Sequence, residues 1–188
     1  MVHQRALEIG IGAGLLGEMV LSGHLNIVAG ALQVVDRRPP GDALTHWTLG
    51  QLLSEPAVRD VRPWLEYLGE HGVGRVAERL AQDGLLERHT PRWRGKVRYT
   101  PVNPTDAWST GARLHSALVN NRPLPDLDLV LVGVVRAIGL DRVVLVDVSP
   151  PVAQRWMAGC VSALPPALRA LVARVEAIVG DVALTHLT

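Results

Sequence analysis

The sequence predicts a mainly α protein: a single globular helical domain with two small β-hairpins. Apolar residues recur at helical spacing in several segments, and two short segments alternate apolar and polar residues around a glycine-containing turn. The chain has 188 residues, of which 48% are hydrophobic, and it contains no internal repeat or low-complexity tract. These values suit one domain over residues 1–188 with a substantial core.

The first predicted helix covers residues 6–22. Leu7, Ile11, Leu15 and Met19 supply one apolar face, and Gly23 follows as a helix-ending residue. Residues 25–36 then alternate around the small pair at 29–30, which predicts the first hairpin.

Two further helices are expected before the centre of the chain, and each has its own start signal. Asp42 is a favourable N-cap for a helix over residues 43–53, and Pro63 favours the start of another over residues 64–68. A separate helix is predicted over residues 73–83, closed by Gly84 in a left-handed conformation.

A basic hairpin over residues 85–100 is the most informative segment. Its strands pair across residues 91–95, and five positive charges fall within eleven residues. Such a hairpin contacts an anionic partner, contacts a protein neighbour, or is simply solvated. The predicted membrane or anion contacts are Arg92, Trp93, Arg94, Lys96 and Arg98.

The C-terminal half is predicted to be helical. A capped helix runs to residue 119, an apolar helix over 127–138 is closed by Gly139, residues 140–146 fit either helix or strand, and two proline pairs precede the last two helices. Charged residues interrupt the apolar stretch 127–148, so we do not expect it to span a membrane.

Composition narrows the function classes. The net charge is +1, so a basic surface must be local. Lys96 is the only lysine, and this arginine bias indicates a GC-rich bacterial genome. Cys160 lies among apolar neighbours and cannot form an internal disulfide, which predicts a buried core residue in a reducing cytoplasm.

One motif suggests an enzyme. Gly12, Gly14 and Gly17 match the dinucleotide-binding pattern, and Asp36 stands near the expected ribose-binding position. The preceding segment continues a helical face, however, and too few residues follow for a crossover helix. We expect these glycines, with Gly10, to permit close helix packing instead.

No other enzyme is indicated. No histidine pair has metal-ligand spacing, and no nucleophile motif or P-loop is present. We therefore expect neither catalysis nor a metal or cofactor, with dinucleotide binding as the one enzymatic alternative.

Several segments together resemble the Golgi phosphoprotein 3 family. They are the glycine-rich opening helix through Glu18 and Gly23, the hairpin ending at Asp36, the Arg75 to Leu86 stretch, the basic hairpin through Pro101, and the apolar run Leu129 to Leu140. They occur in the family's order and span most of the chain. The resemblance is to a bacterial, actinobacterial-type member, and it implies a single mainly α domain without catalytic activity.

The resemblance also implies a function at membranes. Eukaryotic relatives bind phosphatidylinositol 4-phosphate at a basic pocket, and a hairpin serves self-association. The implied protein is cytoplasmic and peripheral at the inner face of the membrane, with an anionic membrane surface and self-association through residues 85–100 as its expected contacts.

The family's pocket side chains are not retained. Its four phosphate-binding positions correspond to His3, Gly12, Glu70 and Val73, while Arg75 matches a neighbouring arginine. Headgroup recognition of the eukaryotic type is therefore not expected. The family's first N-terminal helix is also expected to be absent, which would expose a groove and favour oligomerisation.

Two alternatives remain open on the residues alone. A winged-helix DNA-binding protein would use helix 73–83 and the basic hairpin 85–100 to contact phosphates, although the helix carries mixed charge. A purely structural oligomeric module would pack Trp93 on a neighbouring subunit.

Overall fold

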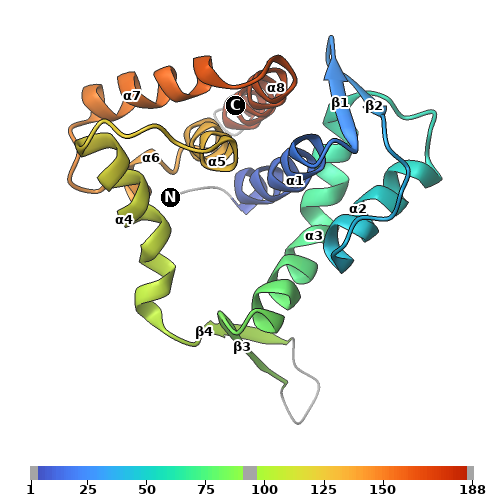
Figure 1. The fold of residues 1–188 in the computed structure, drawn as a ribbon, viewed down its shortest axis with the longest axis horizontal. Coiled ribbons are helices and arrows are strands. Elements are labelled where there is room, and N and C mark those ends of the chain that lie inside the picture. Colours follow the sequence, from blue (N-terminus) through green and yellow to red (C-terminus); the bar gives the residue numbers. More distant parts are fainter. Residues whose placement is uncertain (1–3, 91–96, 186–188) are drawn as a thin grey trace.

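The computed structural model describes residues 4–90 and 97–185, and over these it has eight helices and two antiparallel hairpins (Figure 1). This confirms the predicted fold class. The elements, in chain order, are α1 (Gln4–Leu21), β1 (Leu25–Val28), β2 (Ala31–Val34), α2 (Ala43–Ser54), α3 (Val61–Gln82), β3 (Leu86–His89), β4 (Arg98–Pro101), α4 (Pro104–Val119), α5 (Asp126–Ala137), α6 (Asp141–Val144), α7 (Pro150–Ala163) and α8 (Pro166–Thr185).

Helix α1 lies at the centre of the fold. It packs against α2, α3, α5 and α8, and Figure 1 shows it between α3 on one side and the α5–α8 layer on the other. Ile9, Leu16 and Met19 are fully buried on it. The apolar periodicity of residues 6–22 thus correctly predicts a helix, and burial on several sides makes it the core of the domain.

Glycines let neighbouring helices approach α1 closely. A Cβ added at Gly12 would lie 2.4 Å from the Leu65 carbonyl oxygen, and one at Gly69 would lie 2.3 Å from the Glu8 carbonyl oxygen. Gly10 and Gly17 face α5 and its C-cap: an added Cβ would lie 2.9 Å from the Ile138 side chain at Gly10 and 2.9 Å from the Val130 side chain at Gly17. Close packing is therefore confirmed for three of the four predicted glycines, but the prediction is wrong for Gly14, which has nothing within 4 Å.

The dinucleotide-binding alternative fails on this arrangement. Its glycines lie inside α1 rather than after a strand, so no turn is available to cradle a phosphate. Asp36 accepts hydrogen bonds from the Arg38 side chain at 2.7 to 3.1 Å. Those bonds lower the pKa of Asp36 to about 2 and occupy the carboxylate.

The first hairpin joins the core as predicted. Leu25 pairs with Val34 and Ile27 with Leu32, so that Leu25, Ile27 and Leu32 are buried. A single further bridge links Ala31 to Asp60 at the start of α3. The alternating pattern of these strands therefore matches their burial.

The central region departs from the prediction in one respect. Asp42 caps α2 as expected, but residues 64–68 and 73–83 belong to one 22-residue helix, α3, and not to two. Gly69 and Gly72 interrupt the apolar pattern because they pack on α1, where an added Cβ at Gly72 would meet Leu15 at 2.9 Å. Tertiary packing here outweighs the low helix propensity of glycine.

The second half of α3, the β3–β4 hairpin and the first half of α4 form a projecting segment, which we call the hairpin arm (residues 73–90 and 97–113). No residue whose burial the structure describes in this segment is buried. Gly84 has the predicted positive φ, 75°, and Leu86 to His89 pair with Arg98 to Pro101. Figure 1 shows the arm extending below the rest of the domain.

The C-terminal helices complete the core. Gly139 closes α5 with φ 74°, and the segment that fitted helix or strand begins with the short helix α6. Cys160 is buried, as predicted, and burial raises the pKa of its thiol. Among the described helices, none is both long and apolar enough to cross a bilayer.

Candidate functional site

The positions that correspond to the family's phosphate pocket contribute no positive charge in the described structure. Gly12 lies buried in the α1–α3 contact, whereas Glu70 and Val73 are exposed on α3. His3 lies outside the described residues. An arginine at position 12 would have to displace the Leu65 backbone, so this chain does not offer the family's cation arrangement.

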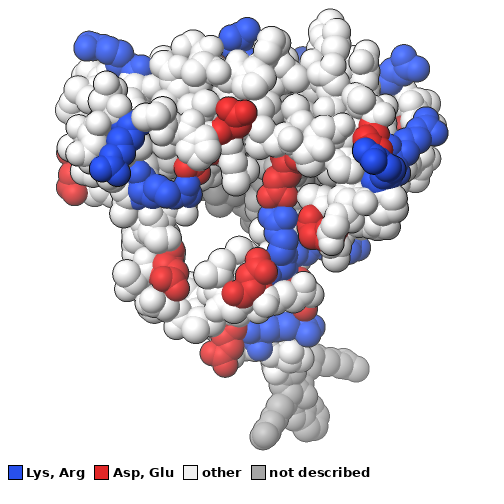
Figure 2. Space-filling view, viewed as in Figure 1, with Lys and Arg blue, Asp and Glu red and all other residues white. Residues whose placement is uncertain are grey.

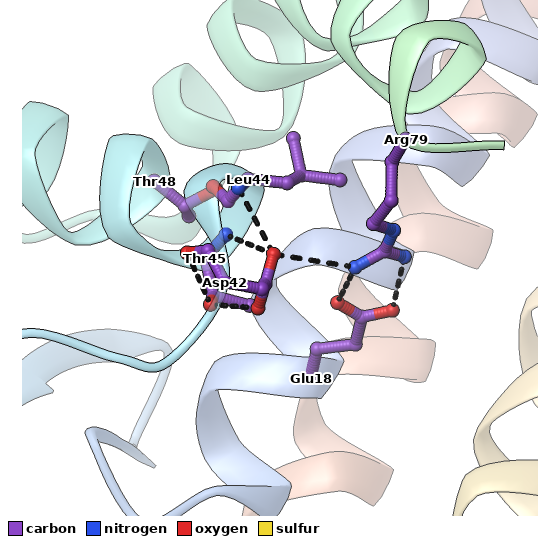
Figure 3. Close-up of polar contacts among 6 residues, drawn as sticks. All are labelled: Glu18, Asp42, Leu44, Thr45, Thr48 and Arg79. Carbon is purple, nitrogen blue, oxygen red and sulfur yellow. Dashed lines mark hydrogen bonds and ion pairs between the residues drawn. The ribbon is translucent and has the colours of Figure 1, made fainter. Parts of the chain in front are cut away.

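A salt-bridged cluster lies close to those positions and joins three helices (Figure 3). Arg79 of α3 donates to both carboxylate oxygens of Glu18 on α1, at 2.9 and 2.7 Å, and its Nη1 lies 3.8 Å from Asp42 Oδ1. Asp42 accepts hydrogen bonds from the backbone N–H groups of Leu44 and Thr45 at the start of α2, at 2.9 and 3.1 Å, and a further one from the Thr45 hydroxyl. The cluster therefore fixes α1, α2 and α3 relative to one another.

The contacts of this cluster favour the charged forms of Arg79 and Asp42. The hydrogen bond with Glu18 is the main cause that raises the pKa of Arg79. Partial burial opposes ionisation of Asp42, but hydrogen bonds from Thr45 and Leu44 and the charge of Arg79 outweigh it and lower the pKa of the carboxyl. Arg79 is therefore a structural cation that is engaged by two carboxylates.

The open cleft beside this cluster, which we call the Glu18–Arg79 cleft, has a volume of about 780 Å³. Its charged lining comprises the four carboxylates of Glu18, Asp42, Glu78 and Asp83 and the two guanidinium groups of Arg75 and Arg79. Arg75 lies over the Trp47 ring, with its guanidinium carbon 4.5 Å from the ring centroid. An excess of carboxylates disfavours a phosphate ligand here.

The β3–β4 hairpin is bonded to α3 through Glu78. Tyr99 on β4 donates to Glu78 at 2.9 Å, and Arg88 on β3 lies 3.9 Å from the same carboxylate. The bond to Glu78 raises the pKa of Tyr99. Glu78 thus positions the hairpin against the end of α3.

Four of the five predicted contact residues lie outside the residues that the structure describes: Arg92, Trp93, Arg94 and Lys96. Arg98 is exposed on β4 and has no ion-pair partner within residues 4–90 and 97–185. Figure 2 shows blue arginine side chains where the hairpin leaves the rest of the molecule.

The sequence prediction missed an apolar component of this arm. Val102 is 60% exposed directly after β4, Trp108 is 63% exposed on α4, and Leu85 is 42% exposed before β3. Leu85 and Val102 are neighbours, since the Val102 N–H donates to the Leu85 carbonyl. The sequence could have indicated that Trp108 is exposed. The residues three and four positions later on the helix, Gly111 and Ala112, are too small to continue an apolar stripe.

Enzymatic chemistry gains no support from these sites. Within the described part of the chain, no group of three or more histidine, cysteine or carboxylate side chains is arranged to hold a metal ion. His24 lies near the cluster, where it bonds to Ser22 at 3.0 Å and to the Arg38 carbonyl at 3.1 Å.

The fold and these sites define a mainly α domain with a central glycine-rich helix, a salt-bridged cleft and a projecting basic hairpin. The model of the Golgi phosphoprotein 3 (GPP34) family matches residues 1–175, and the chain therefore belongs to that family. No curated protein matches the chain.

Proposed function

We propose that this protein is a non-enzymatic domain that binds anionic membrane surfaces peripherally through the hairpin arm. The observation that carries the proposal is the combination of exposed apolar and basic side chains on an arm in which none of the residues of described burial is buried. Membrane-surface binding uses both kinds of side chain, because apolar groups enter the headgroup region and cations attract anionic lipids. Membership of the Golgi phosphoprotein 3 family is consistent with this role.

The proposed lipid selectivity is for negative charge and not for one headgroup. The described pocket positions Gly12, Glu70 and Val73 carry no cation, and the adjacent Glu18–Arg79 cleft has more carboxylates than guanidinium groups. Binding should therefore depend on the charge density of the membrane and weaken with salt.

The winged-helix alternative is less well supported. Residues 73–83 form the end of the continuous helix α3, where Arg79 is held by Glu18 and Arg75 lies over Trp47. A DNA-reading helix would need these cations to be free for phosphate contacts. Self-association through residues 85–100 remains a second proposal, because the same exposed side chains can pack against another copy.

Vesicle co-sedimentation tests the membrane proposal. Wild-type protein should bind vesicles rich in phosphatidylserine, bind neutral vesicles weakly, and be released by salt. Replacement of Arg92, Arg94 and Lys96 by serine should weaken binding by about 3 kcal/mol, on the order of a hundredfold, since each cation near the surface contributes about 1 kcal/mol.

The matched control removes the same charge elsewhere. Arg37, Arg122 and Arg155 are exposed, lie outside the arm, and have no ion-pair partner in the described part of the chain, so their replacement by serine should have little effect. Equal losses in both triple variants would refute the hairpin contact. Unchanged vesicle binding with a loss of oligomers in the hairpin variant would favour self-association instead.

A further inference from the structure

A second cleft, which we call the aromatic cleft, lies between the end of α2 and the start of α3, away from the hairpin arm. Its volume is about 280 Å³, and it is lined by Gln51, Ser54, Glu55, Val58, Pro63, Trp64 and Tyr67. That volume equals roughly nine water molecules at about 30 Å³ each, which is enough for a small organic ion.

The polar groups lining this cleft already bond to protein atoms. The Tyr67 hydroxyl donates to Gln51 Oε1 at 2.6 Å, Trp64 Nε1 donates to the Val58 carbonyl at 2.8 Å, and the Ser54 hydroxyl donates to the Gln51 carbonyl at 2.7 Å. A ligand that depends on many new hydrogen bonds therefore finds few partners here.

The groups of the cleft that remain available to a ligand favour one with a positive charge. Glu55 is exposed, and its side-chain carboxylate has no hydrogen-bond or ion-pair partner within residues 4–90 and 97–185, although its backbone carbonyl accepts from the Val58 N–H. It is also the C-cap of α2, where the partial negative charge of the helix end lies, and the last turn of α2 contains no basic residue. Tyr67 adds an aromatic ring that is 37% exposed.

No cation of the protein lines the cleft in the described structure. Arg59 and Arg62 are close in sequence but are not among its lining residues, and Arg62 pairs with Glu66 and Asp181. The aromatic rings are held in place, since Trp64 and Tyr67 pack edge to face at 6.0 Å and His71 stacks on Tyr67 at 4.4 Å.

We propose that the aromatic cleft binds a quaternary ammonium group. Such a cation has no N–H donors, so the negative charge of Glu55 and an aromatic surface can hold it without any further hydrogen bond. Aromatic side chains combined with a carboxylate are suited to this chemistry. The source is either a free small molecule such as choline or the headgroup of a choline lipid.

Titration with choline chloride, against sodium chloride at equal ionic strength, tests the site. The ¹H–¹⁵N spectrum should show a saturable shift of the Trp64 indole N–H, and the other tryptophan indoles should not shift. Tyr67→Leu and Glu55→Gln change exposed residues at the cleft, and each should weaken choline binding by about three- to tenfold or more, in line with a cation–π contact or a charge. Asp147→Asn, which neutralises an exposed carboxylate outside both the aromatic cleft and the hairpin arm, serves as the unaffected control.

A neutral analogue separates charge from shape. In 3,3-dimethyl-1-butanol a carbon replaces the ammonium nitrogen, so it should bind at least about threefold more weakly than choline. Equal binding of the two compounds, or no saturable shift with either choline or short-chain phosphatidylcholine, overturns the proposal.

A second titration distinguishes the two sources of the quaternary ammonium group. Choline and short-chain phosphatidylcholine are titrated in turn, and binding of either supports the site while showing which source it accepts. This site is independent of the membrane contact by the hairpin arm, because the cleft residues and the arm residues can be changed separately.

Discussion

Helix α1 and the hairpin arm differ more than any other two regions of the molecule. Half of the residues of α1 are buried, and three of its glycines admit neighbouring helices at distances that an added Cβ would violate. In the arm, by contrast, no residue whose burial is described is buried, although large apolar side chains are present. Apolar residues in the first region stabilise the fold, whereas those in the second are available to a partner.

The largest expected effect is in the α1 contacts. Gly69→Ala and Gly12→Ala place a Cβ against a backbone carbonyl, which cannot move as a flexible side chain can. Each should reduce the free energy of unfolding by about 1–3 kcal/mol. Gly14→Ala is the control: it has free space and should stabilise the helix by about 0.5–1 kcal/mol. Urea unfolding measures all three, and equal effects would contradict the packing described here.

The next largest effect should come from the ion pair that joins α1 to α3. Arg79→Met leaves Glu18 half-buried without its bidentate partner, at a cost of about 1–2 kcal/mol after allowance for partial solvent screening. Arg38→Met breaks an exposed pair and should leave the stability almost unchanged. Thermal unfolding of the two variants distinguishes them, and an equally mild Arg79 variant would show that the cluster is not structural.

Helix caps should show the same contrast between regions. Asp42→Ala removes the cap of α2 and should cost about 1 kcal/mol. Asn103→Ala removes the cap of α4 in the arm and should cost about half as much, because none of the residues of described burial in the first turns of α4 is buried. If Asn103→Ala proved the more damaging, the arm would contribute more to folding than its exposure indicates.

Low pH should reduce the difference in stability between the wild type and Asp42→Ala. Its folded-state pKa is lowered, so its stabilising contribution is fully present above the ordinary carboxyl pKa near 4 and is lost as the pH falls through the lowered value. Wild type and Asp42→Ala should therefore become closer in stability as the pH falls from about 4 towards 2, as followed by urea unfolding at a series of pH values. A difference that stayed constant down to that pH would show that the charge of Asp42 is not involved.

The smallest effect on stability should come from the arm itself. Val102→Ser and Trp108→Ser remove exposed apolar groups and should change the free energy of unfolding by less than about 0.5 kcal/mol. The same variants should bind anionic vesicles more weakly. A strongly destabilised Trp108→Ser protein would mean that this ring supports the fold.

The sequence predicts best those structural features that depend on residues close to one another along the chain. Local signals were sufficient for the Asp42 cap and the turns at Gly84 and Gly139. They were only partly right for the apolar face of α1, because the predicted Leu7 is 41% exposed whereas Ile9 and Leu16, outside the predicted face, are buried. They were misleading for α3, since Gly69 and Gly72 look like a helix break until α1 is seen to pack against them. The apolar periodicity of one segment carries no information about which helix packs against it.

The candidate sites depend even more on tertiary contacts. The basic character of residues 88–98 was apparent from sequence, but the engagement of Arg79 by Glu18, which lies 61 residues away, was not. The aromatic cleft likewise joins the end of α2 to the start of α3, where no sequence motif connects Glu55 with Tyr67. Such sites are formed by packing and carry no short sequence signature.

Hydrogen–deuterium exchange with and without anionic vesicles tests the central claim most directly. In solution, amides of α1 should exchange far more slowly than those of β3 and β4, because α1 opens only with the core. On vesicles, new protection should appear in residues 85–110 and not in α1 or α2. Protection confined to α1, to α2 or to the Glu18–Arg79 cleft, or no protection while the protein sediments with the vesicles, would contradict the assignment of the hairpin arm as the membrane contact.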